Sequence, residues 1–318
     1  MNELLASLLT TDALGVLVVA FGVGIVVGLT GMGGGALMTP ALIFLGVNPA
    51  AAVANDLVAA SVNKSVGAAV HWRQGSPNLK LAMYLVIGSV PCAFAGGFIV
   101  KSVGDEAAKT EFLTTAIGYA LLLAAFSYAL RIYLQLRYVA AGNVVSAVEP
   151  AISPIATILV GAFGGLLVGI TSVGSGSLIM VSLLLLYPTL AAPRLVGTDL
   201  VQAVPLVIAA AVGHVITEGV IWAVLLPLIL GGMPGTFLGA KLAGWVSQSV
   251  IRRGIVIVLT LTGLKMLGVP AEWVGIIGAA LLLLGPLAWG YIRQSRGLEP
   301  FDNDSTAWRL PDRRSGGD

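Results

Sequence analysis

The sequence predicts an all-α protein, a polytopic transmembrane helical bundle with two inverted-topology repeats and broken or re-entrant helices. The chain of 318 residues is 57% hydrophobic and only 10% charged, with a mean hydropathy of +0.97. A soluble domain carries about 25% charged residues, so the composition excludes an aqueous enzyme and requires lipid. Two glycine-rich segments also interrupt long apolar runs at corresponding places in the two halves, which is typical of a transporter's binding site.

Apolar runs bounded by charge, proline and glycine predict the helices. In the first half the predicted segments are 12–29, 36–46, 53–72, 78–100 and 111–133. In the second half they are 152–170, 177–187, 195–215, 219–241 and 250–267, and a final segment, 272–292, has no counterpart. Whether the short segments 36–46 and 177–187 cross fully or re-enter stays open. The first segment is expected to be retained, because residues 1–12 lack the positive region of a signal peptide.

These segments divide the chain into five parts. We expect a first transmembrane repeat over 1–133, a cytoplasmic connection over 134–151, a second transmembrane repeat over 152–267, an additional C-terminal transmembrane helix over 268–293 and a disordered cytoplasmic tail over 294–318. The tail is rich in Arg, Asp, Ser, Gly and Pro. Such a composition does not bury enough apolar surface to offset the entropy of folding.

The two halves align with each other, which indicates an internal duplication. An offset of 141 residues aligns the helix before each break, and an offset of 143 aligns the helices that follow. The matched pairs include Gly24 with Gly165, Gly28 with Gly169, Thr30 with Thr171, Asp56 with Asp199, His71 with His214, Gly88 with Gly231, Pro91 with Pro234 and Gly96 with Gly239. Apolar helices share Leu and Val by chance, but matched Asp, His, Pro and Gly in one register favour a true repeat.

The placement of basic residues predicts the orientation, with the N-terminus outside and the C-terminus in the cytoplasm. In this orientation the loops and tail on the inner side hold Arg73, Lys80, Arg131, Arg137, Arg194, Lys241, Arg252, Arg253, Arg293, Arg296, Arg309, Arg313 and Arg314. The outer loops hold only Lys101, Lys109 and Lys265. Positive charge gathers on the cytoplasmic side of membrane proteins, so the opposite orientation is rejected. The protein is expected to be a multi-pass protein of the cell (inner) membrane.

The two breaks are the first candidate binding site. Residues 30–35 read Thr-Gly-Met-Gly-Gly-Gly, and residues 171–177 read Thr-Ser-Val-Gly-Ser-Gly-Ser. A half-helix that starts inside a membrane presents free N–H groups and a partial positive charge, which suit an anion. The alternative is that the glycines only allow helices to pack closely. The candidate residues are Thr30, Gly33, Gly34, Gly35, Thr171, Ser172, Ser175, Gly176 and Ser177.

Lys64 is the only basic residue expected within a span, and a charge in hydrocarbon costs at least about 2.5 kcal/mol, which makes it a functional candidate. It lies on one predicted helix with Asp56 and Asn63, so it could hold the anion or pair with Asp56 when the site is empty. The second half has Val207 at the equivalent position. The alternative is a lysine whose stem reaches to the inner surface.

Asp56 and Asp199 are predicted to start their helices, directly after Asn55 and Thr198. An aspartate at that place caps the helix or balances its dipole. The functional alternative is a carboxylate that exchanges a proton during transport. The two histidines, at equivalent positions in the repeats, are interpreted as structural first and as proton carriers second.

At this point the pattern resembles the TauE/SafE family, also called the sulfite exporter family. The resemblance rests on the glycine-rich break after a first helix, its echo in the second half with Gly-Thr-Asp at 197–199, and the Ala- and Gly-rich helix leading to His214. It covers about residues 12–267. It implies a membrane carrier for sulfite, sulfonates or related anions, without a cofactor. It also implies binding residues at the two breaks and at Asn55, Asp56, Thr198 and Asp199; Lys64 comes from the physical argument alone.

The sequence therefore predicts a transporter, in the sense of an exporter, that moves a small sulfur-containing anion by alternating access around a midplane site. An anion channel or a non-transporting membrane scaffold is the alternative. No enzyme, metal, cofactor or nucleic-acid partner is expected, since no hydrolytic or metal-binding motif stands out. The expected partners are the anion, the lipid bilayer and a coupling proton or ion. The identity of the anion, the direction of transport and the oligomeric state stay open.

Overall fold

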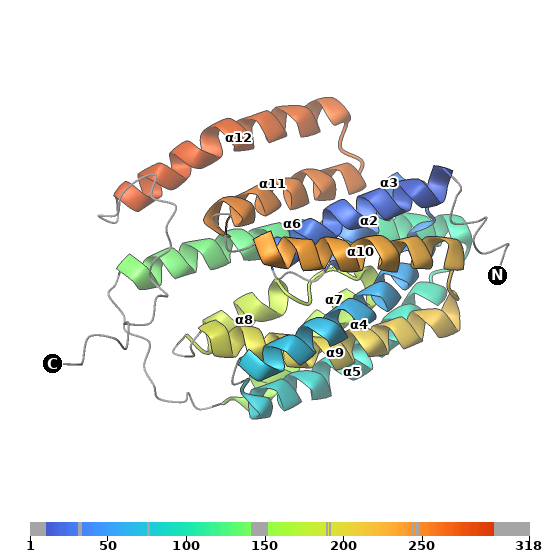
Figure 1. Cartoon of the computed structure of the whole chain (residues 1–318), viewed down its shortest axis with the longest axis horizontal. Coiled ribbons are helices and arrows are strands. Elements are labelled where there is room, and N and C mark those ends of the chain that lie inside the picture. Colours follow the sequence, from blue (N-terminus) through green and yellow to red (C-terminus); the bar gives the residue numbers. More distant parts are fainter. Residues whose placement is uncertain are drawn as a thin grey trace.

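The computed structural model describes residues 11–30, 34–74, 77–140, 152–188, 190, 192–242, 245 and 248–295. Over these residues the chain is helical and has no strand, as predicted (Figure 1). The helices are α2 (Thr11–Thr30), α3 (Gly35–Phe44), α4 (Pro49–Gln74), α5 (Leu79–Lys101), α6 (Glu106–Ala140), α7 (Pro154–Thr171), α8 (Leu178–Leu186), α9 (Ala192–Thr217), α10 (Trp222–Leu242), α11 (Gln248–Met266) and α12 (Ala271–Gln294). Of the predicted tail over 294–318, Gln294 is the last residue of α12 and Ser295 follows it, while residues 296–318 lie outside the described part.

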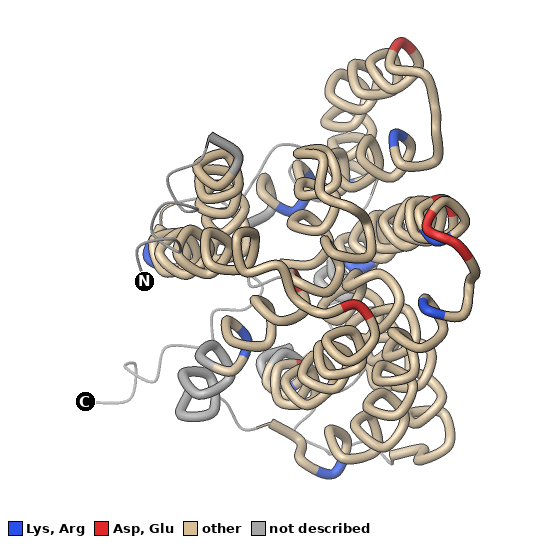
Figure 2. Tube along the Cα trace, turned by 90° about the vertical axis from the view of Figure 1, so that its right-hand side faces the viewer, with Lys and Arg blue, Asp and Glu red and all other residues tan. Residues whose placement is uncertain are grey.

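Seven of the described helices are long and apolar enough to cross a membrane, namely α2, α5, α6, α7, α9, α10 and α12. The other two long helices, α4 and α11, are more polar: α4 carries the Asn63–Lys64 pair, and α11 carries the Arg252–Arg253 pair. Figure 2 shows how few charged positions the described trace has. The class of protein is therefore a multi-pass membrane protein.

Three helices extend three or more residues beyond their predicted bounds. α6 continues to Ala140, so the first residues of the predicted connection over 134–151 are helical. α4 begins at Pro49 and α9 at Ala192, earlier than the predicted starts at 53 and 195. Proline is well tolerated at the first helical position because its missing N–H has no intrahelical partner there. These first turns read Pro-Ala-Ala-Ala and Ala-Pro-Arg, and their prolines and Arg194 hid the helix starts from a search for apolar runs.

The two short helices do not span a membrane. α3 has 10 residues and α8 has 9, which at 1.5 Å per residue gives about 15 Å for each. The hydrocarbon core is about 30 Å thick. Each of these helices therefore covers about half of that depth.

Glycines bring α2 and α10 into direct contact. A Cβ added at Gly231, Gly235 or Gly239 of α10 would lie 2.4, 2.3 or 2.1 Å from a carbonyl oxygen of α2, those of Leu17, Phe21 and Ile25 respectively. Both sets of residues advance in steps of four, so the two helices run in the same direction. Such close approach of backbones is how helices associate without a hydrophobic driving force between them.

The same packing recurs between α5 and α7. A Cβ at Gly161, Gly165 or Gly169 of α7 would lie 2.4, 2.3 or 2.4 Å from a carbonyl oxygen of α5, those of Leu85, Ser89 and Ala93 respectively. Helix α7 is the equivalent of α2 in the aligned halves, and α5 is the equivalent of α10. The first helix of each half therefore packs against the fourth helix of the other half, and the packing is reciprocal.

The equivalent helices α4 and α9 pack against each other and run in opposite directions. The backbone N–H of Asn78 donates to the hydroxyl of Thr198 at 2.9 Å, so α5 begins beside the start of α9. α4 ends at Gln74, only a short connection before α5. α9 therefore starts at the end of the bundle where α4 finishes. Leu57 of α4 and Leu206 of α9 belong to one buried apolar cluster with residues of other helices, including Leu121 and Ile179.

Candidate functional site

The second break is a sharply turned segment between α7 and α8. Ser172, directly after α7, has a φ of 62°, a left-handed conformation that is costly for any residue except glycine. Gly174 has a φ of 116°, and its carbonyl accepts from the N–H of Leu178 at 3.1 Å. The N–H of Val173 donates to the Thr171 hydroxyl at 3.1 Å. These bonds satisfy the backbone where the helix is interrupted.

The two breaks touch each other at Gly35. A Cβ at Gly35 would lie 1.9 Å from the carbonyl oxygen of Ser172. The neighbouring Gly34 has much more room, since a Cβ there would meet nothing nearer than Val27 Cγ2 at 3.8 Å. Gly33 was also predicted to line the site, but it lies outside the described residues. The close approach predicted for the first break therefore involves Gly35 among the described glycines.

Asp56 of α4 fastens the first short helix to the second break. Its Oδ2 atom accepts the hydroxyl of Thr39 in α3 at 2.6 Å and the hydroxyl of Ser172 at 2.7 Å. All three residues are buried, and Asp56 is only 2% exposed. Burial of a carboxyl group is costly unless it is hydrogen-bonded, so these two bonds help to hold it there.

The predicted position of the two aspartates at helix starts is wrong. Asp56 and Asp199 each lie two turns inside their helices, which begin at Pro49 and Ala192. Neither carboxylate can cap its helix from there, because a cap bonds the free N–H groups of the first turn. The Asp56 side chain instead accepts from Thr39 and Ser172, and the Asp199 side chain accepts from Gln202.

Lys64 points to the second break. Its Nζ atom donates to the hydroxyl of Ser175, which is 4% exposed. The ammonium also interacts electrostatically with Asp199 and Asp56. In this structure the side chain is therefore engaged inside the bundle, and the alternative in which it reaches for the inner surface does not describe it.

The remaining predicted residues have more local partners. Asn55 donates to the carbonyl of Ala51 at 2.7 Å, and its Oδ1 is buried without a partner among the described groups. Thr198 donates to the carbonyl of Arg194 at 2.7 Å and accepts from Asn78, so it ties α9 to the start of α5. Asn63 faces α10, since its Nδ2 would lie 3.6 Å from a Cβ at Gly232.

The equivalent threonines at the ends of α2 and α7 behave alike. Thr30 donates to the carbonyl of Val26 at 2.7 Å, and Thr171 donates to that of Leu167 at 2.7 Å. Gly176 is half-buried in the turn, and Ser177 precedes α8 with no side-chain capping bond among the described contacts. These residues shape the breaks, whereas the side-chain contacts to α4 come from Ser172 and Ser175.

Two residues of the site were not predicted. Thr39 lies within α3, and Gln202 donates through Nε2 to Asp199 Oδ1 at 3.0 Å. Both are fully buried polar side chains in apolar helices. A lone glutamine in an apolar helix, one turn after Asp199, could have marked Gln202 as a site residue. Threonine is common in apolar helices, where it bonds its own backbone, so Thr39 carried no signal.

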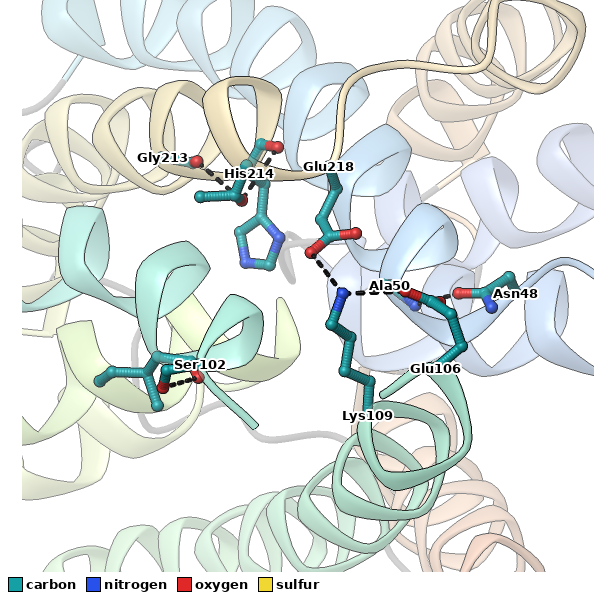
Figure 3. Close-up of polar contacts among 10 residues, drawn as sticks. Asn48, Ala50, Ser102, Glu106, Lys109, Gly213, His214 and Glu218 are labelled. Carbon is teal, nitrogen blue, oxygen red and sulfur yellow. Dashed lines mark hydrogen bonds and ion pairs between the residues drawn. The ribbon is translucent and has the colours of Figure 1, made fainter. Parts of the chain in front are cut away.

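A separate polar cluster lies where α6 begins and α9 ends (Figure 3). Lys109 contacts Glu106 at 2.9 Å and Glu218 at 3.8 Å, with Lys109 and Glu218 only 13% and 14% exposed. In the turn before, His214 contacts the carbonyl of Gly169 through Nε2 at 2.6 Å. These contacts join α6, α7 and α9 at one end of the bundle, in agreement with a structural role for His214. The side chain of His71 lies outside the described part.

The site offers chemistry for a small anion more than for a metal. Among the described residues, no group of three His, Cys, Asp or Glu side chains could hold a metal ion. The groups that meet at the break are an ammonium, serine hydroxyls and backbone turned by glycine. Apolar spanning helices around polar groups held against a broken helix define a membrane transporter.

The comparisons identify the family. The model of the sulfite exporter TauE/SafE family matches residues 16–266, and the chain belongs to this family. It is similar to the probable membrane transporter protein YjnA of Bacillus subtilis (strain 168), with 37% identity over 246 residues, 77% of this chain and 96% of that protein. It is also similar to the probable membrane transporter protein YdhB of the same organism, with 25% identity over 257 residues, 79% of this chain and 99% of that protein. No solved structure matches the chain.

Proposed function

We propose that this protein exports a small sulfur-containing anion, sulfite or an organosulfonate, by alternating access around the contact between the two breaks. The observation that carries the proposal is the bond from Lys64 to Ser175, close to where Gly35 meets Ser172. An anion that enters there would take over the ammonium and the serine hydroxyls as donors. Hydrogen bonds from charged donors to an oxyanion are about twice as strong as neutral ones.

We infer that the two aspartates compete with the anion for Lys64. Both carboxylates interact electrostatically with its ammonium. Protonation of either carboxyl group would weaken this competition and favour binding of the anion to Lys64. This competition gives a physical basis for a proton as the coupling ion.

We infer further that the two halves, residues 1–133 and 152–267, are inverted repeats. The opposite directions of α4 and α9 and the reciprocal glycine contacts support this relation. A rocking motion of one half against the other would then expose the central site to each side in turn. The excess of basic residues supports an inner-membrane location with the C-terminus in the cytoplasm.

Transport by purified protein in liposomes tests the proposal. Vesicles loaded with radiolabelled sulfite, or with methanesulfonate in a second series, are assayed for saturable efflux and for counterflow. Lys64→Ala is expected to lower the efflux rate at least on the order of tenfold, since a charged hydrogen bond contributes about 1.5–3 kcal/mol. Lys101→Ala, a change of the same kind at an exposed lysine at the end of α5, serves as the matched control.

The outcomes separate the candidate functions. Saturable efflux with counterflow that Lys64→Ala abolishes, while Lys101→Ala leaves it intact, supports a carrier that uses the breaks. Ionic current without counterflow supports a channel. If neither anion moves through the correctly folded wild type, the proposed substrate class is wrong.

A further inference from the structure

A second cluster of positive charge lies at the interface of α6 and α11, away from the breaks. Arg131 and Tyr128 lie one turn apart on α6, and Arg252 lies on α11. Tyr128 is 3% exposed and interacts electrostatically with Arg131, Asp199 and Arg252. The two arginines also interact with each other. A buried phenol and two guanidinium groups therefore share one region.

The packing register places these groups opposite one another. A Cβ at Gly118 of α6 would lie 2.7 Å from Leu267 Cγ, and a Cβ at Gly263 of α11 would lie 3.1 Å from Leu122 Cδ2. The numbers rise on α6 while they fall on α11, so the helices are antiparallel. Continuing this register brings Arg131 level with residues 252–254. The cluster lies toward the end of the bundle where α6 ends and α11 begins, at the left in Figure 1.

The cluster is linked to the central site through Asp199. This carboxylate interacts with Lys64 on one side and with Arg131 on the other. Lys64 in turn contacts Ser175 of the second break. Asp199 is therefore a charged group that both Lys64 and Arg131 sense.

Arg131 has an unused donor in this region. Its Nε atom is buried and has no hydrogen-bond partner among the described groups. A buried donor without a partner is costly, and two guanidinium groups near each other repel. One oxyanion between them would satisfy the donor and remove the repulsion, because the planar guanidinium fork matches oxygen pairs of such anions.

We propose that Arg131 and Arg252, with the Tyr128 hydroxyl, form a second binding site for a small oxyanion at the α6–α11 interface, between the central site and the end of the bundle where α6 ends. The inference rests on the proposed anion transport and extends it. An anion that enters from the cytoplasm would be held by the two arginines before it passes Asp199 and reaches Lys64. In the orientation inferred from charge, this site is on the cytoplasmic side and loads the carrier.

Counting bound anions tests the second site without any transport assay. Equilibrium dialysis of the purified full chain in detergent, with radiolabelled sulfite as the probe, is expected to give two bound anions per wild-type chain. Arg131→Gln and Arg252→Gln are each expected to keep only the anion at Lys64. Lys64→Ala is expected to keep only the anion at the two arginines. Arg131→Lys keeps the charge but loses the fork, and it should weaken the second affinity on the order of tenfold.

Arg253→Gln is the matched control, because it neutralises the neighbouring residue of the same helix. Arg253 faces the ring of Trp289 in α12, with 6.0 Å between the guanidinium carbon and the ring centre. Two bound anions in this variant and one in Arg252→Gln would support the site. The proposal is overturned if wild type binds one anion or none, or if Arg131→Gln and Arg131→Lys both bind as wild type does.

The two proposals fail in different ways. If wild type binds two anions but does not transport them in liposomes, the carrier function is wrong and the second site stands. If saturable transport occurs and only one anion binds, the carrier function stands and the second site is wrong.

Discussion

Single residues decide whether the two breaks can meet. Ser172 combines a left-handed backbone with a hydroxyl that donates to Asp56 at 2.7 Å, while Gly35 contributes the absence of a Cβ beside the Ser172 carbonyl. One residue therefore supplies a bond at the cost of backbone strain, and the other supplies space. Each contribution can be tested separately by substitution.

Substitutions at Ser172 separate strain from hydrogen bonding. Ser172→Ala and Ser172→Gly both remove the bond to Asp56, but only glycine adopts a φ of 62° without strain. The glycine variant is therefore expected to be the more stable of the two by about 1 kcal/mol. Thermal melting in detergent measures the difference. An alanine variant that melts at or above the glycine variant would contradict the assigned strain.

Adjacent glycines of the first break should differ in their tolerance of alanine. Gly35→Ala places a Cβ 1.9 Å from the Ser172 carbonyl, which forces the two breaks apart, whereas Gly34→Ala meets nothing within 3.5 Å and keeps a helical backbone with φ of −58°. We expect Gly35→Ala to abolish sulfite efflux and lower the melting temperature. Gly34→Ala should leave both close to wild type. Equal effects of the two changes would mean that Gly35 does not mark the contact.

Asp199 should restrain anion binding. It interacts electrostatically with both Lys64 and Arg131, so the neutral variant Asp199→Asn is expected to tighten sulfite binding several-fold. The asparagine oxygen can still accept from Gln202, which keeps the 3.0 Å contact available. Equilibrium dialysis at neutral pH measures the affinity. A weaker affinity in a folded variant would show that Asp199 supports the site and does not compete with the anion.

At the scale of elements, the glycine contacts determine which helices pair. α2 packs on α10, and the equivalent α7 packs on α5, with backbones closer than any Cβ allows. Apolar patterning does not select these partners, because a leucine-rich face packs as well against lipid as against another helix. Helix α12, which has no equivalent in the first half, packs against α11 at the edge of the bundle (Figure 1).

Alanine at two glycines of one helix pair should have different effects on stability. Gly239→Ala places a Cβ 2.1 Å from the Ile25 carbonyl and is expected to destabilise the α2–α10 contact. Gly22→Ala, on α2, meets nothing within 4 Å. It should be neutral or stabilise by up to about 1 kcal/mol, since alanine favours helix over glycine. Melting temperatures of the two variants, compared with wild type, decide between these expectations.

At the scale of the whole molecule, the opposite directions of α4 and α9 support an inverted repeat. The excess of basic residues supports a topology with the N-terminus outside and the C-terminus in the cytoplasm. The start of α5 and the end of α5 then face opposite sides of the membrane. Lys80 lies near the start of this helix, and Ser102 follows its end; both are exposed. These two positions report on orientation.

Thiol labelling in intact cells tests this topology. In a Cys92→Ser background, Ser102→Cys is expected to react with a membrane-impermeant thiol reagent from outside. Lys80→Cys should react only after the inner membrane is permeabilised. The reverse pattern would invert the topology and would place the second anion site on the outer side.

The sequence by itself determined that this chain spans a membrane, and it predicted that its two halves repeat and that glycines interrupt a helix in each half. Composition and apolar length decide that the chain spans a membrane. Matched Asp, Gly and Pro in one register favour the repeat. Four glycines in residues 31–35 make a continuous helix costly there, and this predicts the interruption. These properties depend on residues close together in the chain, so the sequence pattern reveals them.

Only the tertiary structure decided how the breaks are held. It placed Asp56 inside α4, where it bonds Thr39 and Ser172, and it directed Lys64 to Ser175. These contacts join residues more than a hundred positions apart in the chain, apart from the one to Thr39. The physical reason is that the side-chain period of a helix indicates which residues share a face. It does not indicate which other helix that face will meet, because in lipid the close approach of glycine backbones makes that choice.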